Sequence, residues 1–246
     1  MKDLFRRSLG GPLFLVWIAA NAGCTDEETG LFIQGNVARD APECIAEAES
    51  GTTLLGEGYL DVGLKLDYQA SLLVGNQLTP RGDKASLRTE TMITVIEGAE
   101  VRLFDDTGNG VAEFTVPASG VIGPDSSEDP GFGIINATLI PQTVGSDLAD
   151  LLTNRGEVRT RVAEVRVFGQ TIGGVDVESA AIRYVIRVCE GCLVDFPPAA
   201  LQGTSCSRSQ AEQTGDPPCY IGQDAKVDCR LCASYNDYCG DAAFVQ

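Results

Sequence analysis

The sequence predicts a mainly β protein: an antiparallel β-sandwich with one short helix, followed by a small disulfide-rich C-terminal segment. Three observations support this fold class. Apolar and polar residues alternate over long stretches, only one stretch carries helix signals, and the cysteines gather toward the C-terminal end. The chain has 246 residues, 43% of them hydrophobic and 22% charged, as in an ordinary globular protein. We expect the sandwich over residues 31–192 and the Cys-rich segment over residues 193–246.

In the first two predicted strand regions, apolar residues recur at every second position. Between Leu60 and Val74 the apolar residues fall on even positions, which predicts a strand that buries one face and is bent or broken once. Between Leu87 and Val95 the Leu, Thr, Ile and Val residues fall on odd positions. This second pattern continues in phase through Ala99 and Val101 to Leu103, and it predicts one face throughout.

The remaining strands are predicted from shorter alternations. Two lie at residues 112–116 and 134–140, with Pro117, Gly120, Gly123 and Pro124 as breaks between them. Residues 158–162 alternate in one phase and residues 163–167 in the other, so we expect a β-bulge near Val162. A Gly-rich turn at residues 169–174 precedes a strand over residues 175–188, with Ile182, Tyr184, Ile186 and Val188 facing inward.

One helix is expected at Ser146–Asn154. Ser146 is a suitable N-cap, Asp147 suits the first turn, and Gly156 follows the expected end.

Nine cysteines are present: Cys24, Cys44, Cys189, Cys192, Cys206, Cys219, Cys229, Cys232 and Cys239. Without Cys24, an even set of eight remains, which in an exported protein indicates four disulfides. Five of these eight follow Cys192. If all eight pair, at least one of the five must bond to Cys44, Cys189 or Cys192, so the C-terminal segment should be covalently joined to the sandwich.

Two other uses of the cysteines remain open. Cys189-x2-Cys192 and Cys229-x2-Cys232 together supply the four thiolates of a zinc ribbon. Either pair is also a candidate redox CxxC, although neither has the signature of a strand followed by an amphipathic helix, where a thiol pKa would be lowered.

Residues 1–23 are typical of an export signal peptide. Lys2, Arg6 and Arg7 form a positive region, and the apolar run after it is shorter than the roughly 20 residues of a membrane-spanning helix. The run ends at Asn21-Ala22-Gly23-Cys24, which resembles the lipobox of bacterial lipoproteins, with Asn21 where that family usually has Leu. The resemblance implies cleavage before Cys24, acylation of its thiol, and residues 24–30 as a lipid anchor and short tether.

The residue after the cysteine bears on location. In lipoproteins an Asp there implies retention at the inner membrane, whereas this chain has Thr25, so the resemblance implies a lipid-anchored protein of the outer membrane. The body is loosely similar to uncharacterised envelope lipoproteins, through Gly173-Gly174, Cys189-Glu190-Gly191-Cys192-Leu193, Gly222-Gln223-Asp224 and Val227-Asp228-Cys229. This similarity implies no activity.

Composition excludes several kinds of function. The chain has no histidine, which removes Ser-His-Asp and Cys-His nucleophiles, HExxH metal sites and a histidine general base. The formal net charge of −17 argues against nucleic acid as a partner, because phosphate binding needs clustered Lys and Arg.

Four surface motifs were weighed as sites. Asp105, Thr107 and Asn109 match positions 1, 3 and 5 of a calcium loop before Gly110, but position 12 is Val116 where a carboxylate is needed. A β-turn is the alternative. Asp125–Asp129 is a second acidic loop. Arg81-Gly82-Asp83 spells an adhesion tripeptide in a turn-like context.

The fourth motif is a set of arginines in the last two long strands, which suits either an anion site or pairing with Glu157, Glu164, Asp176 and Glu178. These arginines are Arg155, Arg159, Arg161, Arg166, Arg183 and Arg187.

The sequence thus predicts a lipid-anchored cell-envelope protein with a non-catalytic binding, assembly or structural role. The expected partners of such a protein are the membrane and an envelope protein or glycan, and no cofactor is expected. The alternatives are an exported enzyme that uses carboxylates or a CxxC thiol pair, and a calcium-dependent adhesion module.

Overall fold

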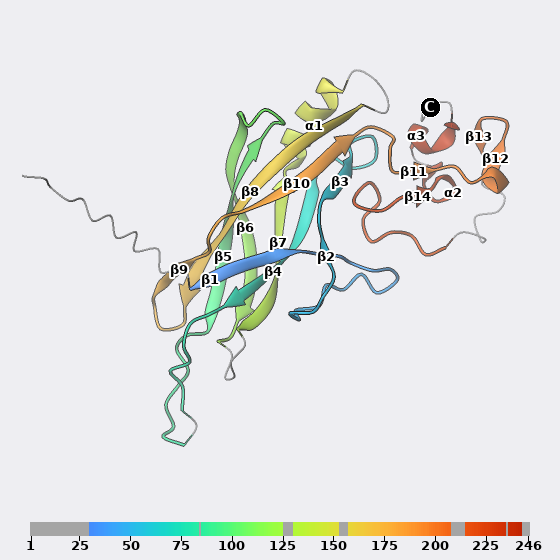
Figure 1. The fold of residues 1–246 in the computed structure, drawn as a ribbon. Helices are drawn as coiled ribbons and strands as arrows, with labels where there is room; N and C mark the ends of the chain where they lie inside the picture. Colours follow the sequence, from blue (N-terminus) through green and yellow to red (C-terminus); the bar gives the residue numbers. More distant parts are fainter. Residues whose placement is uncertain are drawn as a thin grey trace, which may run out of the picture.

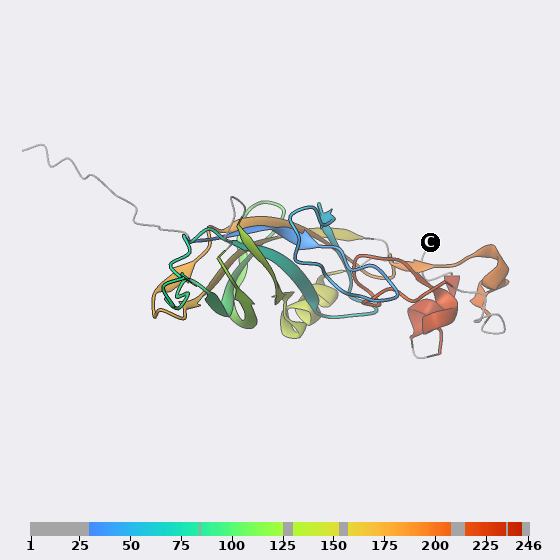
Figure 2. The same ribbon diagram turned by 90° about the horizontal axis from the view of Figure 1, so that it is seen from below.

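The computed structural model describes residues 30–83, 85–124, 130–152, 157–207, 215–234 and 236–242. The lipobox with Cys24, the acidic loop 125–129, Arg155 and Gly156 lie outside these ranges. Over the described residues the chain forms two sheets that pack on one another, with a Cys-rich segment beyond one end of them (Figure 1; Figure 2). The mainly β fold class is therefore confirmed.

The first sheet has four strands in the order β2-β1-β4-β7, all antiparallel. Their bounds are β1 Leu31–Val37, β2 Leu54–Leu55, β4 Tyr68–Asn76 and β7 Gly131–Ile140.

The second sheet follows the order β3-β10-β8-β5-β6, with β9 paired to β8. Its pairs are antiparallel apart from β3 and β10, which run parallel. The bounds are β3 Gly58–Asp61, β5 Thr94–Phe104, β6 Gly110–Ile122, β8 Val158–Thr171, β9 Asp176–Glu178 and β10 Ile182–Cys189.

One core lies between the two sheets. Leu72 of β4 and Leu139 of β7 meet Val101 of β5, Val165 of β8 and Ile186 of β10, and all five are fully buried. The predicted break in the first alternation is confirmed, because β3 ends at Asp61 and β4 begins at Tyr68.

A bulge at Glu97 changes the phase of β5. The register of β5 against both β6 and β8 shifts between Ile96 and Gly98. Even residues face the core before the bulge and odd residues after it, so Ile96 is buried while Val95 is 39% exposed. The prediction of one continuous face from Leu87 is therefore wrong. Leu87 lies in a long loop at residues 77–93 that projects from the sheet, and its side chain is 91% exposed (Figure 1).

The bulge predicted near Val162 is absent. β8 pairs with β10 in unbroken register across Val162, and the phase of Ala163–Val167 extends back to position 161. Val158 is consequently 49% exposed, and Arg161 takes an inward position at 5% exposure. The Arg161 guanidinium donates to the carbonyl of Thr160, and its Nε has no hydrogen-bond partner among the described residues. Burial lowers the pKa of Arg161, while the nearby acids Asp105 and Asp106 act in the opposite direction.

Two predicted breaks fall inside strands. Pro117 and Gly120 belong to β6, which tolerates proline because it is the last strand of its sheet. The strand expected over residues 175–188 is divided into β9 and β10, and Gly169 belongs to β8 rather than to the turn.

The helix α1 spans Gln142–Leu151, four residues earlier than predicted at its start. It follows directly on β7, with Pro141 in the N-cap position and no side-chain cap, so Ser146 lies in mid-helix. The chain turns into the helix as soon as β7 ends, and this leaves no room for a loop up to Ser146. None of the described helices is long and apolar enough to cross a membrane.

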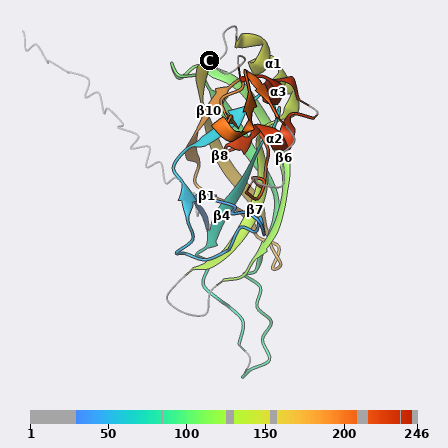
Figure 3. The same ribbon diagram turned by 90° about the vertical axis from the view of Figure 1, so that its right-hand side faces the viewer.

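The Cys-rich segment has short elements only. The strand β11 at Val194–Asp195 pairs parallel with β14 at Val227–Asp228, and β12 at Leu201–Gln202 pairs with β13 at Ser205–Cys206. A 3-10 turn spans Pro198–Ala200. The segment also contains two short helices, α2 at Cys229–Cys232 and α3 at Asp237–Gly240 (Figure 3). Its small core consists of Val194, Ala200, Val227 and three buried cysteines.

The contact of α1 with the sandwich depends on Gly145. A Cβ at this position would overlap the carbonyl oxygen of Leu66. We expect Gly145→Ala to lower the free energy of unfolding by about 1–3 kcal/mol, because the helix must move away from the core. Gly123→Ala is the matched control, since nothing lies within 4 Å of its added Cβ. Urea unfolding of both variants measures the difference, and equal stabilities would contradict this packing.

Candidate functional site

A cleft lies where the Cys-rich segment meets the end of the first sheet. Its volume is about 350 Å³. One wall is formed by residues 36–41 with Leu55, Gln69 and Ser71, and the other by residues 216–226 of the Cys-rich segment. The cleft therefore depends on how that segment is held against the sandwich.

The floor of the cleft is a buried network around Asn36. The Asn36 amide nitrogen donates to the hydroxyls of Tyr68 and Tyr184, each at 3.1 Å, and its oxygen accepts from the Ser71 backbone nitrogen at 2.8 Å. The two tyrosine hydroxyls lie 3.1 Å apart. Burial is the main reason that the pKa of each tyrosine is raised, so both are neutral hydroxyls across the ordinary pH range.

Asp224 connects this network to the Cys-rich segment. Its backbone has φ 62°, a left-handed conformation that Asp tolerates in turns. The Tyr68 hydroxyl donates to its two carboxylate oxygens at 2.9 and 3.0 Å, and the Tyr59 backbone nitrogen donates at 2.9 Å. Burial raises the pKa of Asp224, against the opposing effect of these donors and of Gln223.

Gln223 extends β4 with its side chain. Its amide oxygen accepts from the Gln69 backbone nitrogen at 3.0 Å, and its amide nitrogen donates to the Gln69 carbonyl at 2.7 Å. A single side chain thus satisfies both backbone groups of Gln69, as a neighbouring strand would.

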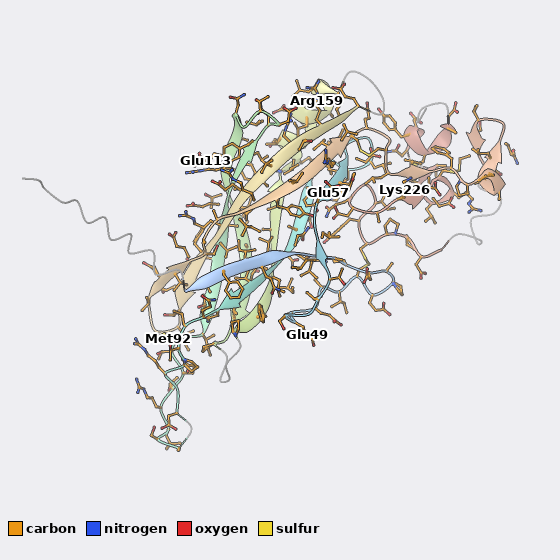
Figure 4. The ribbon with its side chains drawn as sticks, in the orientation of Figure 1. Glu49, Glu57, Met92, Glu113, Arg159 and Lys226 are labelled. Atoms are coloured by element: carbon orange, nitrogen blue, oxygen red, sulfur yellow. A yellow bond between two sulfur atoms is a disulfide. The ribbon has the colours of Figure 1, made fainter. Side chains whose placement is uncertain are left out.

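Cations and an aromatic ring line the mouth of the cleft. The Arg39 Nε donates to Ser71 Oγ at 2.7 Å, and another nitrogen of the guanidinium donates to the Asn136 amide oxygen. The guanidinium lies 5.3 Å from the centre of the Tyr220 ring, and Lys65 Nζ lies 5.4 Å from it. Lys226, on the Cys-rich wall, is a further cation of the lining (Figure 4).

The eight described cysteines form four disulfides: Cys44–Cys219, Cys189–Cys192, Cys206–Cys229 and Cys232–Cys239. The prediction of four bonds is confirmed, and so is the covalent link to the sandwich, because Cys44 bonds to Cys219 beside the cleft. The zinc-ribbon alternative is wrong for this structure, since Cys189, Cys192, Cys229 and Cys232 are all engaged in disulfides.

The second CxxC has a different local structure from the expected one. Cys229 and Cys232 lie on α2, directly after β14, and Asp228 caps this turn by accepting from the Arg230 backbone nitrogen at 2.9 Å. The two cysteines bond to different partners, so this CxxC is not a redox pair.

The predicted calcium residues form a turn. Asp105 accepts from the backbone nitrogens of Thr107 and Asn109 at 2.9 and 2.8 Å, and from the Thr107 hydroxyl at 2.7 Å. The Thr107 hydroxyl is the leading reason that the pKa of Asp105 falls to about 2. The carboxylate thus already serves as the centre of the β5–β6 turn, and calcium binding here stays a prediction.

The arginines of the last two long strands are mostly paired with acids. Arg159 contacts Glu157, Arg166 contacts Glu178, Arg183 contacts Glu164 and Arg187 contacts Glu57, whereas Asp176 accepts from Gln170. The pairing alternative is confirmed for Arg159, Arg166 and Arg183, whereas Arg187 pairs with Glu57, an acid outside the predicted set. In the Arg-Gly-Asp tripeptide, the Asp83 carboxylate is occupied by the Ser86 hydroxyl at 2.6 Å and the Ala85 nitrogen at 2.8 Å.

No protein-family model, curated protein or solved structure matches this chain. The site is therefore interpreted from its own geometry.

The cleft residues Asn36, Ser71, Gln223 and Asp224 are not predicted as site residues from the sequence. Ser71 occupies an odd, outward position in the alternation from Leu60 to Val74, and Gly222-Gln223-Asp224 enters only through a loose resemblance. The sequence signal that could have indicated the cleft is the turn sequence Gly222-Gln223-Asp224, which closely follows Cys219.

Removal of the Cys44–Cys219 bond should destabilise the protein more than loss of an ordinary surface contact. The bond closes a sequence separation of 175 residues, so the chain-entropy account predicts a loss of about 5 kcal/mol in the double variant C44A/C219A. The free energy of unfolding in urea checks this value. A loss below about 1 kcal/mol would mean that hydrogen bonds alone hold the segment in place.

The Asp224 carboxylate should make stability depend on pH. Its pKa is higher in the folded than in the unfolded chain, so its contribution is fully present below the unfolded pKa and is lost as pH rises through the folded pKa. We expect the stability deficit of Asp224→Asn relative to the native chain to shrink between pH 4 and pH 8. Urea midpoints across this range measure it, and a deficit that grows with pH would contradict a raised pKa.

Proposed function

We propose that this chain is a lipid-anchored bacterial envelope protein with a non-catalytic role, which holds a polar ligand or a segment of an envelope partner in the cleft beside Cys44–Cys219. The observation that carries the proposal is the cleft itself: a cavity whose two walls belong to different parts of the chain and are joined covalently at its edge.

The disulfides support an exported location. Four disulfides persist in oxidising compartments and are rare where cellular thiols are kept reduced. The Cys-rich segment, with few apolar residues in its core, needs these bonds to stay folded.

The fold would present the cleft away from the membrane. Gly30 is six positions after Cys24, and a chain of that length spans at most about 20 Å. An acylated Cys24 would therefore keep the beginning of β1 close to the lipid. The loop 77–93 lies at that same end, whereas the Cys-rich segment lies at the other (Figure 1). Figure 4 labels Met92 near the base of the loop and Lys226 beside the cleft, at opposite ends of the molecule.

The cleft is organised before any ligand arrives. Asn36 and Ser71 of the first sheet are nearly inaccessible, and the network around Asn36 holds the floor in one arrangement. Arg39, Lys226, Asp40 and Asp216 offer charges of both signs around this floor. These charged groups can orient a polar ligand through hydrogen bonds and ion pairs.

The anchor is tested by the intact mass of the protein extracted from membranes. We expect cleavage before Cys24, a mass increase from acylation, and eight further cysteines without free thiols. The variant Cys24→Ala should be found in the soluble fraction. An uncleaved or unacylated native chain would contradict the anchor.

The binding role is tested with a photo-crosslinking residue at Ala225 in the cleft wall, introduced into the full chain in its native host. The matched control is the same residue at exposed Ala181, on the outer face of the second sheet. We expect one defined crosslinked species at Ala225 that disappears in C44A/C219A. Equal crosslinking at both positions, or none at Ala225, would count against a ligand in the cleft.

A further inference from the structure

The Cys189–Cys192 disulfide lies at the end of β10, on a loop that the proposed binding role does not use. It closes the four-residue loop Cys189-Glu190-Gly191-Cys192, with a sequence separation of 3. This loop packs against Asp61 at the end of β3, and the Asp61 side chain is completely buried.

The loop is held in place without its disulfide. The backbone nitrogens of Gly191 and Leu193 donate to the two oxygens of Asp61 at 2.7 and 2.9 Å. The Val62 nitrogen donates to the Cys189 carbonyl at 2.8 Å, and the Val227 nitrogen to the Leu193 carbonyl at 2.8 Å. Opening the sulfur bond would leave these contacts intact, so the two sulfurs would stay next to each other.

The other three disulfides have a different place in the fold. They span separations of 175, 23 and 7 residues and join elements of the Cys-rich segment to each other or to the sandwich. A bond across three residues constrains the unfolded chain least, so its loss costs the least stability. Cys189–Cys192 is therefore the one disulfide among the described residues that can open while the fold stays closed around it.

The two sulfurs differ in access. Cys189 is fully buried, whereas Cys192 is partly exposed. An incoming thiolate can reach only Cys192, and Cys189 becomes the leaving group. One carboxylate oxygen of Asp61 lies within 4.8 Å of both sulfurs, a distance that one water molecule spans.

We propose that Cys189–Cys192 is a thiol–disulfide exchange site that accepts electrons from a dithiol of a partner protein, with Asp61 as the residue that positions the loop and relays protons. A partner thiolate attacks Cys192 Sγ, the bond to Cys189 breaks, and the electron pair passes to Cys189 Sγ, which is protonated through Asp61. The second partner thiolate then attacks the partner's sulfur in the mixed disulfide and releases Cys192. The partner loses two electrons and two protons, and Cys189 and Cys192 gain them.

The surroundings of Asp61 suit this role. Burial raises the pKa of the Asp61 carboxyl group, and the charge of Glu190 adds to the increase. The backbone nitrogens of Leu193, Gly191 and Gly63, which donate to the carboxylate, act in the opposite direction. The hydroxyl of Tyr238 donates to Glu190, and the side chain of the adjacent Lys65 pairs with Asp67 at 2.7 Å. No cation among these neighbours therefore neutralises Asp61.

The first experiment is a graded reduction of the full mature protein with dithiothreitol, followed by alkylation and peptide mass analysis. We expect Cys189–Cys192 to be reduced about tenfold faster than Cys232–Cys239, because the latter bond is buried at both cysteines. The near-ultraviolet circular dichroism should remain native at that point. Reduction of all four bonds together, or only on unfolding, would overturn the proposal.

A matched pair of variants tests which sulfur is attacked. In Cys189→Ser the remaining Cys192 thiol should react with an aromatic disulfide reagent in the folded protein. In Cys192→Ser the remaining Cys189 thiol should react only after denaturation. Equal protection of both thiols would refute attack at Cys192.

The relay is tested by the pH profile of exchange. Asp61→Asn retains one acceptor oxygen for the loop and should abolish the carboxyl inflection in the rate, whereas Glu190→Gln should only shift it. An unchanged inflection in Asp61→Asn would remove Asp61 from the exchange. If Asp61→Asn does not fold, the two variants Cys189→Ser and Cys192→Ser still decide whether the site undergoes thiol–disulfide exchange.

Discussion

The structure depends on the contact between residues 219–225 and the end of the first sheet. Gln223 satisfies both backbone groups of Gln69, and Asp224 accepts from Tyr68 of the sandwich. These bonds are made by partly buried polar groups, for which an unmatched partner would cost more than an ordinary hydrogen bond contributes. The Cys44–Cys219 bond then limits how far the segment can separate from the sheet. The second wall of the cleft exists only because this contact is made.

Charge on the outer face of the sandwich has a smaller role. Arg102 and Arg183 are more than half exposed in their pairs with Glu113 and Glu164, and each such pair contributes less than about 1 kcal/mol. Arg159, Arg166, Arg183 and Arg187 are thus each paired with an acid. The net negative charge of the whole chain is compatible with these ion pairs, because net charge affects solubility rather than the fold.

Several parts of the fold could be predicted because their cause is local. The alternation from Leu60 to Val74 determines which face is buried, and the count of eight cysteines with five after Cys192 requires a bond to the sandwich. The errors have one physical origin. The phase of a strand is set by its neighbours as well as by its own pattern, so the bulge at Glu97 and the unbroken register at Val162 depended on β6, β8 and β10. Asp61 shows this dependence most clearly. The alternation from Leu60 to Val74 places it on the outward face, yet a loop 130 residues away buries it completely.

The sequence by itself determined the fold class, the break between β3 and β4 and the existence of a covalently joined Cys-rich segment, since period, composition and parity are properties of the chain alone. Only the tertiary structure decided which cysteines pair, that Asn36, Tyr68 and Asp224 form one network, and that Asp61 supports the Cys189–Cys192 loop. The network and the Asp61 contacts join residues separated by 32 to 156 positions. Nothing in a local pattern records such contacts, because the free energy that selects them comes from burying polar groups against partners brought together by folding.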